Sequence, residues 1–181
     1  MAIDILSICL GVRCYFGSDE NLKEVYKGLY VGGDGSVPEA RKRGMSVIHA
    51  CKDGDFSHRA LLKYESMGAP KGHEYLVAKR PGNLYLNLID ADEPDFVPDA
   101  VVNEALNFIK DSLGKDKSVL IHCNHGLSRS PTIAFLYLYS AGKLPSEYHR
   151  AVRAFRQLYP QYDPSTGLEL YAKRRIRDWK R

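Results

Sequence analysis

The hydrophobic and polar positions divide the chain into short apolar runs, mostly in its first two thirds, and longer amphipathic stretches, mostly in its last third. Brief β-branched or alternating runs predict strands, and apolar residues spaced three and four apart predict helices. Strands are predicted at residues 5–16, 29–32, 46–50, 74–78, 83–88 and 118–121. Helices are predicted at 38–43, 59–66, 98–113, 131–141 and 167–179, with one more that Ser146 caps and that carries Ala151, Val152, Phe155 and Leu158.

Strands that alternate with helices and then give way to a run of helices indicate an α/β domain with a central mixed β-sheet flanked by helices. The length of 181 residues favours one domain spanning 1–181. Residues 52–83 fit the alternation least well. Their basic side chains either wall a substrate cleft or face solvent; they are His58, Arg59, Lys63, Lys79 and Arg80.

The stretch 121–131 links a predicted buried strand to a predicted helix through a tight loop. Pro131 suits the first turn of that helix, where its missing N–H is no loss. Backbone N–H groups at a helix N-terminus, together with the helix dipole, form a site for an anion. The local pattern therefore predicts an anion-binding loop.

The residues within this loop suggest phosphate chemistry. A helix N-terminus lowers the pKa of a cysteine thiol, which makes Cys123 a candidate nucleophile. The Arg129 guanidinium offers two parallel donors to phosphate oxygens. Gly126 permits the backbone turn that lets amides converge on one point, and the Ser130 hydroxyl lies where it can donate to the sulfur. The alternative is a buried structural cysteine that happens to precede a surface arginine.

His122-Cys123 followed by Gly126 and Arg129-Ser130 resembles the phosphate-binding loop of the cysteine-dependent protein phosphatases, and Arg-Ser-Pro resembles their dual-specificity branch. The resemblance implies the fold of that branch, with Cys123 as nucleophile and Arg129 and Ser130 as its catalytic partners. It also implies that the amides of the loop bind the phosphate. His122 is expected to orient the loop by hydrogen bonding; a packed histidine at the strand end is the alternative. Those loop residues are Asn124, His125, Gly126, Leu127 and Ser128.

An acid that protonates the leaving oxygen is implied by the same resemblance. Relatives carry an Asp at the end of a neighbouring strand, about thirty residues before the nucleophile, and aligning Tyr85-Leu86 with them identifies Asp92, with Asp90 as the runner-up. The alternative for this acidic group is a favourable interaction with the N-terminus of the helix that begins at Pro98, which also explains Asp95.

Three further features are compared with the relatives: the segment 52–83, Cys51 and the pair Pro164-Ser165. Compact relatives need fewer residues at 52–83, so this part resembles an insertion. In some lipid-phosphatase relatives a cysteine matching Cys51 forms a reversible disulfide with the nucleophile; a buried free thiol is the alternative. Relatives often have Pro-Asn where this chain has Pro164-Ser165.

The composition of the chain limits the cellular compartment and the kinds of partner that we expect. The four cysteines of the chain show no Cys-x-x-Cys and no zinc spacing, so neither a metal nor a disulfide framework is predicted, and a working thiol favours a reducing, cytoplasmic location. The first ten residues lack a basic leader, and we expect no signal peptide and no membrane partner. The net charge of +4 favours an anionic substrate only mildly.

The predicted function is therefore a protein-tyrosine or dual-specificity phosphatase that needs no metal or cofactor and acts on phosphorylated proteins through a phosphocysteine intermediate. An RNA 5′-triphosphatase is the runner-up, because His-Cys-x-His-Gly is similar to that group through His125; those enzymes typically continue Arg-Thr-Gly. The loop lacks the Lys that phosphoinositide phosphatases usually carry. A non-catalytic phosphate-binding module is the third hypothesis.

Overall fold

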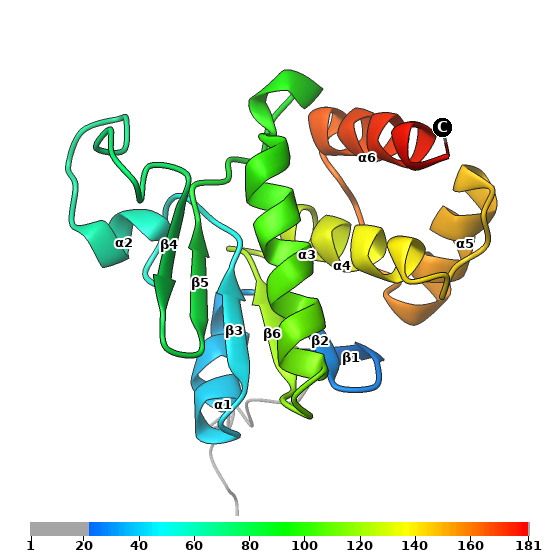
Figure 1. Ribbon diagram of the computed structural model, residues 1–181, viewed down its shortest axis with the longest axis horizontal. Coiled ribbons are helices and arrows are strands. Elements are labelled where there is room, and N and C mark those ends of the chain that lie inside the picture. Colours follow the sequence, from blue (N-terminus) through cyan, green and yellow to red (C-terminus); the bar gives the residue numbers. More distant parts are fainter. Residues whose placement is uncertain (1–21, 181) are drawn as a thin grey trace, which may run out of the picture.

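The computed structural model describes residues 22–180 and contains one six-stranded mixed sheet. The strand order is β1-β2-β6-β3-β5-β4 (Figure 1). β2, β6, β3 and β5 run parallel, whereas the outer strands β1 and β4 are antiparallel to their neighbours. The strands are β1 (Leu22–Tyr26), β2 (Leu29–Gly32), β3 (Ser46–His49), β4 (Val77–Arg80), β5 (Asn83–Leu86) and β6 (Val119–His122).

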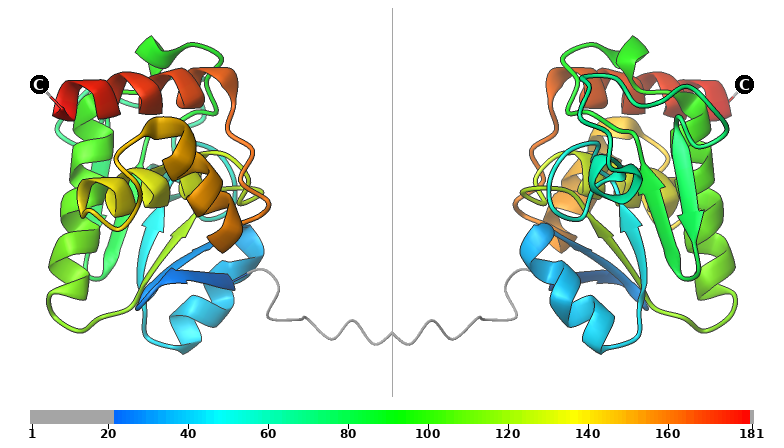
Figure 2. Two further views of the ribbon diagram at one scale, coloured as in Figure 1. Left: turned by 90° about the vertical axis from the view of Figure 1, so that its right-hand side faces the viewer. Right: turned by 90° about the vertical axis from the view of Figure 1, so that its left-hand side faces the viewer.

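Helices cover both faces of the sheet (Figures 1 and 2). One face packs against α1 through a small cluster of Val37, Ala40, Val47 and Leu120. The other face and the helices beyond it, α3 to α6, enclose the larger core. The helices are α1 (Val37–Lys42), α2 (His58–Leu62), α3 (Asp99–Leu113), α4 (Arg129–Ser140), α5 (Tyr148–Leu158) and α6 (Thr166–Trp179), with the short 3-10 turns η2 (Asp34–Ser36) and η3 (Pro94–Phe96).

The predicted fold class is confirmed, and most predicted elements are present within a few residues of their expected bounds. The prediction of Ser146 as a cap is wrong: the Glu147 carboxylate caps α5 by accepting from the amides of His149 and Arg150. The helix begins at Tyr148, one residue later than a cap at Ser146 implies, and the Glu147 side chain accepts from its free amides. The strand predicted at 5–16 lies outside the described residues.

The segment 52–76 contains less regular structure than its sequence suggested. α2 ends at Leu62, four residues short of the predicted limit, because Lys63 adopts a left-handed conformation with φ of 55°. The predicted strand at 74–78 is observed as β4, beginning later at Val77. Figure 1 shows α2 and the loop that follows it beside β4. That this region is an insertion into a single domain stays a prediction.

The parallel strands bring their carboxyl ends to one edge of the sheet. In the register of these strands Gly32 pairs with His122, and His122 pairs with His49. The segments that follow β2, β3, β5 and β6 therefore emerge side by side. Ligands bind at this edge in open α/β sheets. Within the described residues, no helix combines the length and the apolar character that crossing a membrane requires.

Candidate active site

The loop between β6 and α4 has a backbone shape that depends on Gly126. Gly126 has a φ of +75°, and a Cβ at this position would lie 2.8 Å from the carbonyl carbon of Gly32. The Tyr159 hydroxyl donates to the carbonyl oxygen of Gly126 over 2.9 Å. A larger residue would strain the backbone and push it away from β2. The close approach therefore holds the loop against the end of the sheet.

Cys123 lies at the floor of a small cavity at this edge. The cavity measures about 240 Å³, and Cys123 is 2% exposed. Its Sγ atom lies 3.2 Å from the Oγ atom of buried Ser130, which also lies 3.2 Å from the carbonyl oxygen of Gly32. The cavity is lined by Asp90, Cys123, His125, Leu127, Ser128, Arg129, Asp163, Pro164 and Ser165.

Arg129 begins α4 and forms part of the same cavity wall. Its guanidinium donates from Nη2 to Oδ1 of Asn124 over 2.7 Å and reaches the carbonyl oxygen of Leu88 at 3.5 Å. Its Nε atom is buried, lies 3.9 Å from a carboxylate oxygen of Asp90, and has no hydrogen-bond partner. An unsatisfied buried donor is costly, so an anion that accepts from it would be stabilised here.

Asn124 connects the loop with two other segments. Its Nδ2 atom donates to Oδ2 of Asp34 over 3.2 Å and to the carbonyl oxygen of Asp53 over 2.9 Å. Since Oδ1 accepts from Arg129, every hydrogen-bonding atom of this amide has a partner. Asn124 thereby holds the guanidinium relative to the segments that follow β2 and β3.

The acidic loop places its candidate acids differently. Asp90 lines the cavity and accepts from the Ser128 hydroxyl over 2.7 Å. Asp92 is exposed, is not among the lining residues, and forms no side-chain hydrogen bond or ion pair with the described part of the chain. Buried Ala91 lies between them. The carboxylate of Asp90 is therefore hydrogen-bonded to Ser128 and close to Arg129, whereas the carboxylate of Asp92 has no such partner among the described residues.

The start of α6 supports this acidic loop from behind. Ser165 donates from Oγ to the carbonyl oxygen of Ala91 over 2.7 Å, and its amide donates to Oγ of Ser128 over 2.9 Å. Gly167 donates from its amide to the same Ala91 carbonyl. Ser165, the departure from the relatives, therefore joins the acidic loop to the cysteine loop.

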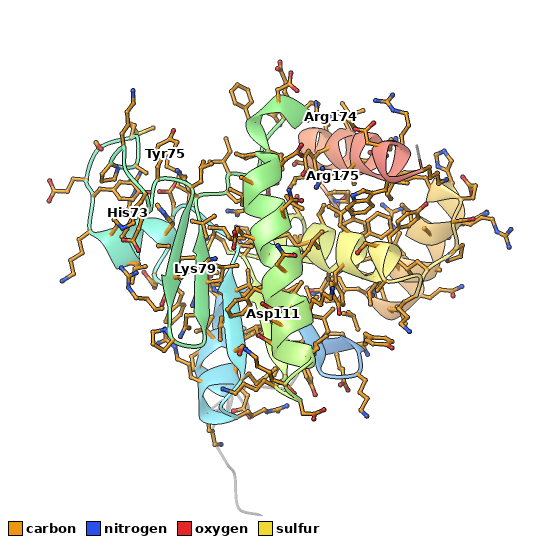
Figure 3. All side chains as sticks on the ribbon, in the orientation of Figure 1. His73, Tyr75, Lys79, Asp111, Arg174 and Arg175 are labelled. Carbon is orange, nitrogen blue, oxygen red and sulfur yellow. The ribbon has the colours of Figure 1, made fainter. Side chains whose placement is uncertain are left out.

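Two arginines of α6 complete that support from outside the cavity. Arg174 binds Oδ1 of Asp95 over 2.6 Å, and Arg175 lies 3.6 Å from Oδ2 of Asp99. Figure 3 shows both arginine side chains on α6, close to the start of α3. The basic character of this helix is thus partly neutralised by acidic groups of the neighbouring segment.

Behind Cys123, a row of polar side chains crosses the end of the sheet. His122 contacts Oδ1 of Asp34 through Nδ1 at 3.0 Å and Nδ1 of His49 through Nε2 at 2.6 Å. Nε2 of His49 lies 3.1 Å from Oδ1 of Asn83. The hydrogen bond from His122 lowers the pKa of Asp34, and burial lowers the pKa of His49 to about 3.

Cys51 is also buried at this edge and, like Cys123, carries a free thiol. Burial raises the pKa of Cys51 to about 12, so it is protonated at neutral pH. Ligand atoms of Cys51, Asp34 and His122 lie within 4.8 Å of one another. Within this trio His122 is hydrogen-bonded to Asp34, whereas the Cys51 thiol points to the carbonyl oxygen of Phe56 at 3.9 Å.

The segment 52–83 approaches the site through its backbone. The carbonyl of Asp53 accepts from Asn124, and Gly54 packs against the same amide. None of its basic side chains lines the cavity. His58 is buried, and the others that form ion pairs do so with Asp53, Glu104 and Glu74. Figure 3 shows His73 and Tyr75 beside α2 and β4, whereas Lys79 reaches Glu104 of α3.

Several site residues were not predicted from the sequence. No sequence motif marks Asp34, His49 or Tyr159, because these residues come from segments that are distant from the loop in the chain. The sequence signalled Ser165 only as a departure from the relatives. Among the residues predicted from the loop, the structure places Cys123, His125, Leu127, Ser128 and Arg129 along the cavity, with His125 and Leu127 exposed. His122, Asn124, Gly126 and Ser130 are not among the lining residues.

Comparisons with known proteins agree on this architecture. The family model described as the catalytic domain of dual specificity phosphatases matches residues 61–171. The human protein "Dual specificity protein phosphatase 12" is 26% identical over 153 residues, which cover 83% of this chain and 40% of that protein. The Arabidopsis thaliana protein "Dual specificity protein phosphatase 1B" is 27% identical over 148 residues, covering 82% of this chain and 77% of that protein. The chain thus spans about two fifths of the length of the human relative.

Solved structures show the same fold at low identity. A leucine rich repeat and phosphatase domain containing protein from Entamoeba histolytica superposes with a TM-score of 0.63 at 17% identity, covering 88% of this chain and 93% of that chain. The human tyrosine phosphatase-like serine/threonine/tyrosine-interacting protein superposes with a TM-score of 0.62 at 20% identity, covering 89% and 99%.

Proposed function

Because the chain belongs to the dual-specificity phosphatase catalytic-domain family, we propose that it hydrolyses phosphate monoesters of proteins, with phosphotyrosine as the main substrate and phosphoserine and phosphothreonine as further ones. The observation that supports this most directly is that the sulfur of Cys123 and the buried Arg129 line one small cavity, with the hydroxyl of Ser130 against that sulfur.

In the first step the thiolate of Cys123 attacks phosphorus while the ester oxygen leaves, which gives a phosphocysteine. The amides of residues 124–128 and the guanidinium of Arg129 stabilise the equatorial oxygens. These donors supply the positive charge that the reaction needs, so the proposed mechanism uses no metal or cofactor. His122 orients the loop from the strand end.

In the second step water attacks phosphorus, and the bond between phosphorus and sulfur breaks. The hydroxyl of Ser130, 3.2 Å from the sulfur, donates to the departing thiolate of Cys123. A carboxylate of the acidic loop accepts the proton from water, after protonating the leaving oxygen in the first step.

We assign this acid and base role to Asp92, with Asp90 as the alternative. The carboxylate of Asp90 lines the same cavity as Cys123, but it accepts from Ser128 and lies close to Arg129. Within residues 22–180, Asp92 has no side-chain partner and lies two residues after Asp90, which lines the cavity. Substituting each with Asn separates the two: loss of the acid slows a poor leaving group far more than a good one.

The charge of the cavity favours a monoester over a 5′-triphosphate. Its wall contains the carboxylates of Asp90 and Asp163, whereas its basic groups are Arg129 and the exposed imidazole of His125. Further phosphates would meet carboxylates at the rim. An RNA 5′-triphosphatase therefore stays the second candidate, supported by His125 alone. The third, a non-catalytic phosphate-binding module, is disfavoured because the nucleophile, the arginine and acidic candidates are all present.

The test is hydrolysis of an aryl phosphate by the parent and by Cys123→Ser, followed by phosphotyrosyl peptide, phosphoseryl peptide and RNA 5′-triphosphate. We expect turnover of the phosphotyrosyl peptide and its loss in the variant. Activity confined to RNA would favour the second candidate. Binding of phosphopeptide without turnover by the parent would favour the third.

A disulfide between Cys51 and Cys123 stays a prediction. Mild peroxide treatment followed by peptide mapping tests it, with Cys51→Ala as the control. A Cys51–Cys123 cross-link in the parent supports the pair, and a Cys123 that oxidises beyond the sulfenic acid without a cross-link contradicts it.

A further inference from the structure

The row Asp34–His122–His49–Asn83 has acceptors at both ends. The Nδ2 atom of Asn83 donates to the carbonyl oxygen of Pro81 over 2.9 Å, which turns Oδ1 toward His49. At the other end, Asp34 is ionised, because the hydrogen bond from His122 lowers its pKa. A carboxylate and an amide oxygen accept only. Each end of the row therefore requires a proton on the imidazole nitrogen that faces it.

This requirement determines the protons of the two rings. Nδ1 of His122 must carry a proton for Asp34, and Nε2 of His49 must carry one for Asn83. The remaining nitrogens, Nε2 of His122 and Nδ1 of His49, face each other at 2.6 Å. Two lone pairs at that distance would repel, and two protons would collide. One proton must lie between them, so the pair of imidazoles carries one positive charge.

The charge belongs on His122 rather than on His49. Of the two rings, His122 is the one that touches the Asp34 carboxylate, and an opposite charge in contact favours the protonated ring. His49 is fully buried, and burial and the neighbouring His122 lower its pKa to about 3, which keeps it neutral. The Tyr85 ring, 4.1 Å away and nearly parallel, contacts one face of His49.

We propose that His49 is a positioning residue whose Nδ1 lone pair holds His122 as a two-donor imidazolium directly behind Cys123. The protonation of His122 does not depend on the proposed function, but its consequence does: a cation at the end of the strand before Cys123 stabilises the thiolate form of the nucleophile. His122 donates from Nδ1 to Asp34 and from Nε2 to His49, and His49 donates from Nε2 to Asn83.

The other groups that face His49 and His122 do not change the assignment of the positive charge to His122. The thiol of Cys51 is neutral, because burial raises its pKa to about 12. The ring of Phe56 meets His122 edge-on at 6.3 Å. The backbone of Phe56 also hydrogen-bonds to His49, but this raises the pKa of His49 less than burial lowers it. Arg41, which lies over the Phe56 ring, and Arg129 act at longer range, on His49 and on Asp34 respectively. Asp34 is thus the carboxylate that balances His122 directly.

A pair of substitutions isolates the lone pair of His49. His49→Asn keeps an acceptor oxygen near the former Nδ1 position, whereas His49→Leu removes it at similar volume. Without an acceptor, a proton on Nε2 of His122 would be buried with no hydrogen-bond partner, which is costly. The ring therefore loses that proton and remains a neutral donor to Asp34. The first variant should preserve the imidazolium and the second should lose it.

The direct measurement is nitrogen-15 NMR of the imidazole rings at neutral pH, which counts protons on each nitrogen without any substrate. We expect both nitrogens of His122 protonated in the parent and in His49→Asn, and one in His49→Leu. Only Nε2 of His49 should be protonated in the parent. A neutral His122 in the parent, or an unchanged His122 in His49→Leu, overturns the proposal.

The second measurement is the rate of alkylation of Cys123 by iodoacetamide at pH 6. It should fall in His49→Leu, by at most about tenfold for one unit in the proton affinity of the thiol, and stay at the parent rate in His49→Asn. Equal rates in both variants would contradict the inference. Because neither readout needs turnover, a protein with no phosphatase activity could still pass, and an active phosphatase with neutral His122 would fail.

Asn83→Leu provides an independent variant in case His49→Leu does not fold. Removing the acceptor for Nε2 of His49 frees that ring to take the opposite tautomer and to donate from Nδ1 to His122. The proposal then expects a neutral His122 and slower alkylation, as in His49→Leu, and unchanged rings would contradict it.

Discussion

Gly167→Ala offers a sharp test of how the acidic loop is held. Gly167 is the second residue of α6, where Ala would favour the helix by about 1 kcal/mol in the absence of other effects. A Cβ at this position, however, would lie 2.5 Å from the carbonyl oxygen of Ala91 and 2.6 Å from the amide nitrogen of Glu93. Ordinary contacts between such atoms are about 3.5 Å.

The backbone at Ala91 and Glu93 must therefore retreat from α6 by about 1 Å, carrying with it the two aspartates between β5 and η3. A displacement of that size at a reacting group can reduce a rate about 100-fold. We expect kcat/KM for a phosphotyrosyl peptide to fall by about that factor. Overpacking, at about 1 to 3 kcal/mol, offsets the helix gain, so the free energy of unfolding should fall only slightly.

The assay compares this peptide with 4-nitrophenyl phosphate, whose leaving group depends much less on an acid. We expect a loss within about fivefold for the latter, and alkylation of Cys123 at the parent rate. Gly72→Ala is the control, because a Cβ there meets nothing within 4 Å. Equal losses on both substrates, or no loss on either, would refute the conclusion that α6 positions the acid.

Further outcomes follow from the contacts around the cysteine. Asn124→Ala should raise the inhibition constant of vanadate about tenfold, since Arg129 loses the acceptor that orients its guanidinium; an unchanged constant would mean that the loop alone holds it. The folded-state pKa of Asp34 is lowered by the hydrogen bond from His122, so its contribution to stability is present above the ordinary value of 3.8 and is lost as pH falls through the folded pKa. The Tm difference between the parent and Asp34→Asn should therefore shrink below about pH 3.8, and a constant difference would contradict this. Cys51, with a pKa raised to about 12, should resist iodoacetamide at neutral pH while the nucleophilic sulfur reacts, as peptide mapping would show.

The local sequence determined most of the elements and the centre of the site. Strands such as β2 and β6 and helices such as α3 were predictable, because their hydrophobic periodicity follows from which side faces the core. The spacing of Cys123, Gly126 and Arg129 was sufficient for the loop, because a strand, a tight turn and a helix start within a few residues of one another. The family comparisons agree with this interpretation.

Tertiary structure decided what surrounds that loop. Nothing near Asp34 or His49 in the sequence indicates that they meet behind His122; the parallel register of β2, β6 and β3 brings them together. Likewise, two nearly adjacent aspartates could not be distinguished by pattern, because their difference arises from Ser128 and α6, which come later in the chain. Periodicity records only the neighbours within an element, whereas the direction and partners of a side chain depend on segments that folding brings together.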